Sequence, residues 1–169
     1  MRVGISLLPL ASGELGGSGA SARQLVRALG AVGTLDYVVF VQGSETAVAG
    51  NGVPAVDVPE PVPAGRSPAG LASYAVTAFR SHRAQSRAET LDVLHYALTN
   101  PVPRADTPTV VTLHDVQHRD LPDFFGAGRR SYRRTAYDDA VHSAAAGIAA
   151  TESDSQQAND LHQHNPEER

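Results

Sequence analysis

Polar side chains that can do chemistry gather directly after an apolar run in the second half of the chain. His114 and Asp115 follow the run Thr109–Leu113, and His118 comes three positions later. An imidazole can donate a hydrogen bond to a hydroxyl or carry a proton near neutral pH, and Asp115 can orient that ring. The spacing therefore predicts a site for a hydroxyl-bearing ligand. Two alternatives stay open. His114 satisfies backbone groups in a loop, or His114, Asp115 and His118 hold a metal ion, an interpretation that is weak because it has only three potential ligands.

A glycine-rich stretch forms a second candidate site. It separates the first apolar run, residues 2–8, from an amphipathic segment that begins near Ala22, and it contains Gly13, Gly16, Gly17 and Gly19. Glycines let the backbone approach a ligand closely, and a helix N-terminus offers free N–H groups to a phosphate or sugar oxygen. We predict a loop over residues 9–19 that binds such a group.

Two known phosphate-binding motifs can be tested against this stretch. The GxxxxGK[ST] loop is excluded, because all 14 basic residues of the chain are arginine. Residues 17–22 fit the dinucleotide pattern G-x-G-x-x-A, but about eight residues separate them from the strand that should precede them directly. Gln42 stands where an acidic residue would hold a ribose. The nicotinamide or flavin interpretation is therefore weak, while a loop whose glycines serve only turns stays open.

Apolar runs alternate with amphipathic segments along the whole chain. This alternation is typical of βαβ units, so we expect an α/β fold: a Rossmann-like, doubly wound, mainly parallel sheet with helices on both faces. The proline-rich residues 59–68 read as a loop. The expected strands are 2–8, 37–41, 53–58, 92–96, 109–113 and 147–150, and the expected helices are 22–32, 69–89, 127–144 and 153–164.

Composition narrows the class of protein. With 169 residues the chain is long enough for one domain. A formal charge of -4 argues weakly against a nucleic-acid partner, and the absence of cysteine excludes disulfides and thiolate metal sites. The Ala-, Gly-, Val- and Arg-rich composition suggests a GC-rich bacterial genome. With no leader-like segment and no long apolar stretch in the sequence, we expect a cytoplasmic protein.

Several segments together resemble the family 4 retaining glycosyltransferases of the GT-B fold. The first run with Gly16, Gly17 and Ser18 is similar to that family's first strand and glycine loop, and residues 108–118, PTVVTLHDVQH, are similar to its P-x-V-V-T-L-H-D segment. Residues 92–95, 121–125 and 149–153 extend the resemblance over most of the chain. Each motif is modest alone; their order and spacing make the match specific.

The resemblance implies the N-terminal, acceptor-side domain of a two-domain enzyme. Such enzymes transfer a sugar from a nucleotide-sugar donor with retention, without a bound metal and without a tightly bound cofactor. Residues 1–169 would form this domain, cut before its last strand, and the C-terminal donor-binding domain would be missing, so we expect the isolated chain to be inactive. The residues that would take part are His114 and Asp115 in catalysis, Gly16, Gly17 and Ser18 at the donor phosphate or sugar, Tyr96, Thr99, Asn100 and His118 at the acceptor, and, as a further candidate, Glu152.

The nature of the acceptor stays open among a sugar, a lipid-linked molecule and another small molecule. Arg129, Arg130, Arg133 and Arg134 crowd one expected helix beside two tyrosines. A solvated helical face is the first interpretation, and an anionic acceptor or lipid headgroup is the alternative, which the net acidic charge weakens. A non-catalytic α/β module that binds a small molecule or a partner is the competing hypothesis for the whole chain.

Overall fold

The computed structural model describes residues 1–12, 16–42, 52–58, 90–99, 101, 105–114, 117–149 and 156. The predicted loop 59–68 and helix 69–89 lie outside these residues, as do Asn100, Asp115 and Glu152 and nearly all of the predicted helix 153–164. Within the described ranges, no helix is both long enough and apolar enough to cross a membrane.

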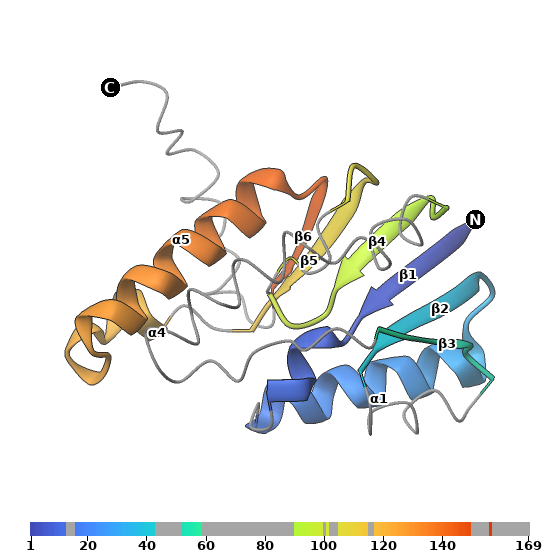
Figure 1. Cartoon of the computed structure of the whole chain (residues 1–169), viewed down its shortest axis with the longest axis horizontal. Helices are drawn as coiled ribbons and strands as arrows, with labels where there is room; N and C mark the ends of the chain where they lie inside the picture. Colours follow the sequence, from blue (N-terminus) through green and yellow to red (C-terminus); the bar gives the residue numbers. More distant parts are fainter. Residues whose placement is uncertain are drawn as a thin grey trace.

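Six strands of the described chain form one sheet in the order β3-β2-β1-β4-β5-β6, and every neighbouring pair is parallel (Figure 1). This arrangement confirms the α/β, Rossmann-like fold with its doubly wound strand order. The strands are β1 (Arg2–Ser6), β2 (Asp36–Val41), β3 (Ala55–Asp57), β4 (Val93–Tyr96), β5 (Thr109–Leu113) and β6 (Ala146–Ala149). The helical elements are η1 (Leu8–Ser12), α1 (Gly16–Val32), α4 (Gln117–Asp120), η3 (Pro122–Phe124) and α5 (Ala127–Ser143).

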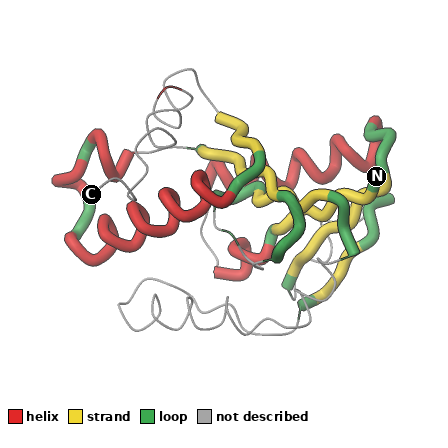
Figure 2. Tube along the Cα trace, turned by 90° about the horizontal axis from the view of Figure 1, so that it is seen from above, coloured by secondary structure: helices red, strands yellow, loops and turns green. Residues whose placement is uncertain are grey.

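The two faces of the sheet carry separate hydrophobic clusters. Successive side chains of a strand point to opposite faces, so a strand buried on both sides is apolar without interruption. In β2, Val38 and Phe40 belong to the cluster that includes Ala140 of α5. Val39 and Val41 belong to the cluster that includes residues of α1. The two helices accordingly cover opposite faces of the sheet, as Figure 2 shows from above.

Gly4, in the middle of β1, is required by close packing. A Cβ atom at this position would collide with Leu91 Cδ1 and come within 3.0 Å of Phe40 Cε2 and 3.1 Å of Leu94 Cδ1. All three neighbours belong to the α5-side cluster, and Phe40 is fully buried. The central strand therefore lets side chains of its two neighbours meet across it.

Some predicted boundaries need correction. The predicted loop over residues 9–19 is wrong at 9–12 and 16–19, because η1 occupies residues 8–12 and α1 already begins at Gly16; residues 13–15 lie outside the described residues. Glycine suits this helix start because Gly16 adopts a positive φ there, which glycine tolerates best. The strand predicted at 147–150 lies one residue earlier, and the turns of α4 and η3 were not predicted.

Candidate functional site

The strand order changes direction between β1 and β4. After β1 the chain builds β2 and β3 on one side, and it then crosses to build β4, β5 and β6 on the other. In open parallel sheets, ligands bind outside the carboxyl ends of the strands at such a point of reversal. The segments that follow β1, β4 and β5 meet at this edge, which we call the carboxyl edge.

Gly16 and Gly17 open helix α1 on the connection that leaves β1. Gly16 has a φ of 46°, in the left-handed region that favours glycine. A Cβ atom on either residue would find nothing within 4 Å. Ser18 is half-buried in the same turn. Neither glycine has a side chain that would cover the first backbone N–H groups of the helix, so a ligand oxygen can approach these groups closely. We call the surface formed by Gly16 and Gly17 the glycine surface.

His114 follows β5 at the carboxyl edge and is half-buried. Its Nε2 lies 2.8 Å from the backbone oxygen of Ala97 in the segment after β4. A carbonyl oxygen only accepts, so Nε2 carries the proton and donates it, and Nδ1 of the neutral ring is then an acceptor. The predicted alternative of a backbone contact is correct for Nε2. The same contact fixes how the rest of the ring is presented.

Thr99 fastens the segment after β4 to β5. Its Oγ1 donates to the backbone oxygen of Thr112 over 2.6 Å, and the side chain is 1% exposed. Its φ is 64°, a conformation that a β-branched residue adopts only when its surroundings hold it there. The hydroxyl that we predicted at the acceptor therefore points to the protein backbone, and its role toward an acceptor stays a prediction.

His95 is a residue of this region that the sequence analysis did not select. It lies inside β4, nearly buried, with Nε2 2.7 Å from Thr112 Oγ1. Burial, and to a lesser degree the nearby His114, lowers the pKa of His95 from 6.5 to about 4. The ring is neutral at physiological pH. The sequence did carry a signal for this residue: a histidine stands inside an otherwise apolar strand, and a threonine stands near the end of the following strand.

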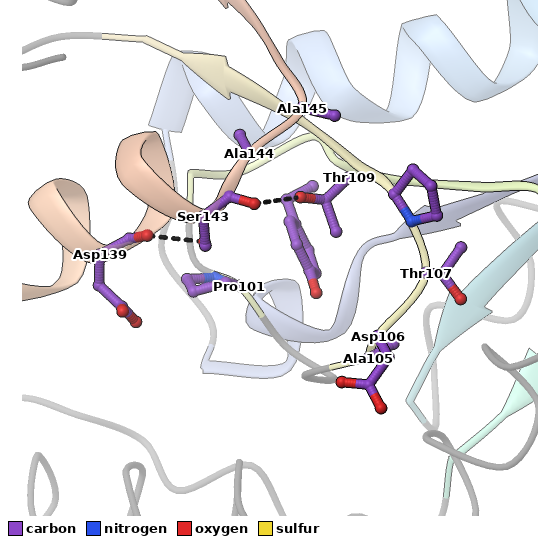
Figure 3. A pocket seen from close by; sticks show the side chains of 11 residues that line it. Pro101, Ala105, Asp106, Thr107, Thr109, Asp139, Ser143, Ala144 and Ala145 are labelled. Carbon is purple, nitrogen blue, oxygen red and sulfur yellow. Dashed lines mark hydrogen bonds between the residues drawn. The ribbon is translucent and has the colours of Figure 1, made fainter.

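Tyr96 lines a cavity of about 620 Å³ on the face of the sheet that α5 covers. Asp106 and Asp139 contribute carboxylates to its wall (Figure 3). Ser143 joins two parts of that wall, because its Oγ donates to the Asp139 carbonyl over 2.6 Å and its carbonyl accepts from Thr109 Oγ1 over 3.4 Å. The predicted acceptor residue Tyr96 thus lies in the wall of a cavity, and its own side chain is 2% exposed.

His118 lies apart from these groups, in the packing between α4 and α5. Its ring is 2% exposed and meets the ring of Tyr137 edge to face, with centroids 5.0 Å apart and planes at 88°. The structure therefore brings together the segments that carry Gly16, Thr99 and His114 at one edge. It seats His118 in a helix contact.

No metal-binding group is formed within the ranges that the structure describes: no three His, Asp or Glu side chains come together there.

Neither the known family models nor the curated protein sequences compared with this chain gave a match.

Proposed function

We propose that this chain is the acceptor-binding half of a retaining glycosyltransferase that uses a nucleotide-sugar donor. The observation that carries the proposal is the open helix start formed by Gly16 and Gly17 on the connection from β1. It stands beside the reversal of strand order, where parallel α/β sheets bind their ligands. Backbone N–H groups there suit the oxygens of a sugar or a phosphate.

His114 would contact the transferred sugar or the acceptor through Nδ1. With Nε2 donating to Ala97, Nδ1 can accept a hydrogen bond from a sugar hydroxyl or take up its proton. Asp115, which the resemblance pairs with His114 in catalysis, adds a second acceptor in this proposal. The donor would be held mainly by a C-terminal domain of the parent enzyme, so the chain alone should bind acceptor-type sugars and bind nucleotide sugars weakly.

A matched pair of variants tests the glycine surface. Gly17 and Gly128 are each the second residue of a helix, and both have open space where a Cβ would lie. Saturation-transfer NMR with a panel of glycosides and sugar phosphates should detect binding to the chain and to Gly128→Val. Gly17→Val should lose the binding of the sugar phosphates, because Gly16 and Gly17 would lie at the donor phosphate or sugar, while its circular dichroism and thermal midpoint stay close to those of Gly128→Val.

Each of the following results would contradict a different part of the proposal. Micromolar binding of a nucleotide sugar to this chain alone would refute the division of the site between two domains. Equal sugar-phosphate binding by the two valine variants would exclude Gly16 and Gly17 from the site. Failure of every sugar to bind would favour the non-catalytic α/β module. In the complete parent enzyme, His114→Ala should lower turnover, and unchanged turnover would exclude the proposed role of His114.

A further inference from the structure

The segment between β5 and the middle of α5 exposes apolar side chains at its turn. This segment, residues 117–134, contains α4, η3 and the start of α5, and we call it the tip. Phe124 is 81% exposed and Leu121 is 50% exposed. The two residues are fixed in one turn, because the Phe124 N–H donates to the Leu121 carbonyl over 3.2 Å. Figures 1 and 2 both show the α4 end of α5 projecting from the body of the sheet.

The turn is held in place by contacts with α5. Arg119 pairs with Asp138 over 2.6 Å, and Arg133 lies over the ring of Phe125 at 5.1 Å from its centroid. A cation above an aromatic face is attracted to it. These contacts tie α4 and η3 to the helix while leaving Phe124, next to Phe125, turned outward. The exposed apolar pair is thus a supported part of the fold.

Positive charge is concentrated in the same segment. The tip contains five arginines and two aspartates, in a chain whose formal charge is -4. Arg130 and Arg134 are exposed and four residues apart, so they share one side of α5; Arg134 also lies 4.0 Å from the carboxylate of Asp138. Exposed apolar side chains in one segment with exposed arginines match the interface of an anionic bilayer, where the apolar groups enter the acyl boundary and the cations meet the headgroups. A nucleic acid would match the arginines and leave Leu121 and Phe124 unused.

We propose that the tip docks this protein onto an anionic lipid bilayer. The tip follows β5 and therefore lies beyond the carboxyl edge, on the same side as the segment that carries His114. Docking through Phe124 would hold the carboxyl edge next to the membrane surface. The extension to a lipid-linked acceptor rests on the proposed function, whereas vesicle binding itself does not.

The test is cosedimentation of the full chain with vesicles. Vesicles of phosphatidylcholine with 30 mol% phosphatidylglycerol, about a third anionic lipid, should bind the chain, and vesicles of pure phosphatidylcholine should not. Binding should weaken as salt is raised, because the charges are exposed. Arg130→Gln with Arg134→Gln should lower the partition constant about 30-fold, since each arginine near the surface contributes about fivefold. Leu121→Ser with Phe124→Ser should lower it about tenfold or more.

The chain offers a matched control at the other end of the sheet. Val32 is 79% exposed at the end of α1, and Arg27 is exposed on the same helix. The double variant Arg27→Gln and Val32→Ser should bind anionic vesicles as the parent chain does. All of the substituted side chains are substantially exposed, so circular dichroism should show each variant folded.

Four outcomes would overturn the proposal. In the first, the chain does not bind anionic vesicles, and in the second it binds neutral vesicles equally well. In the third, the α1 control variant loses as much vesicle binding as the tip variants. In the fourth, the chain binds duplex DNA as tightly as it binds vesicles. A change of oligomeric state in Phe124→Ser, measured by light scattering, with vesicle binding unchanged would assign the apolar turn to a second copy of the chain. If vesicles bind while no glycoside does, docking stands and the proposed function fails.

Discussion

Acidification should weaken the fold through His95. Folding holds this ring nearly buried against Thr112 and lowers its pKa from 6.5 to about 4. The unfolded chain therefore binds more protons than the folded chain between these two values, and stability rises with pH in that window. The contribution of the neutral ring is complete above pH 6.5, falls as the pH drops, and levels off near pH 4. Between pH 7 and pH 5 the loss is about 2 kcal/mol, worked from the difference between the two pKa values.

Urea denaturation at pH 7 and pH 5 measures this loss, and two variants isolate it. His95→Gln should be less stable at both pH values, but its free energy of unfolding should change about 2 kcal/mol less between them than that of the parent chain. Val111→Ala, at a buried site with no titratable group, should shift both values equally and keep the pH dependence. A pH dependence in His95→Gln equal to that of the parent chain would refute the buried, neutral state of His95.

Three further substitutions test the packing and the backbone of the site by urea denaturation at neutral pH. Gly4→Ala should lose about 1–3 kcal/mol through collision with Leu91, and an unchanged midpoint would mean that β1 is not packed so closely. Thr99→Val should lose about 1–3 kcal/mol because the Thr112 carbonyl loses its donor; a stabilised variant would contradict the bond. Gly16→Ala should lose about 1–2 kcal/mol from its positive φ alone, as the space around it is open, so a gain in stability would exclude that conformation.

The strands were predictable because strands of a parallel sheet are rich in apolar and β-branched residues. The run 109–113 matches β5 at both ends, and 37–41 differs from β2 only at Asp36. Helix starts were harder, since Gly16 and Gly17 are poor helix formers and read as loop residues. Their place in α1 follows from the packing of Ala22 and Val26 against the sheet, which local propensity does not express.

The candidate site was predictable in position but not in detail. Strand ends and parallel topology indicate that His114 lies at the carboxyl edge with the start of α1. They do not indicate that its Nε2 is taken by the Ala97 carbonyl, because that contact depends on where the chain turns after β4. The same turn requires a positive φ at Thr99, which no residue preference announces. His95 was not predicted, because one polar residue in an apolar strand does not by itself indicate a site. Its hydrogen-bond partner Thr112 is identified only by the structure.

The separation of the core into two clusters has a consequence for how mutations combine. Val38 and Val39 are consecutive, yet they face different clusters, while Phe40 and Leu94 are 54 positions apart and share one. Losses of stability at independent sites add, and those within one packed cluster interact by about 0.5–3 kcal/mol. A double-mutant cycle should therefore find alanine substitutions additive at the consecutive pair and coupled at the distant pair. In this fold, distance along the chain does not measure energetic distance: the sheet is a partition, and side chains interact with those on their own side of it.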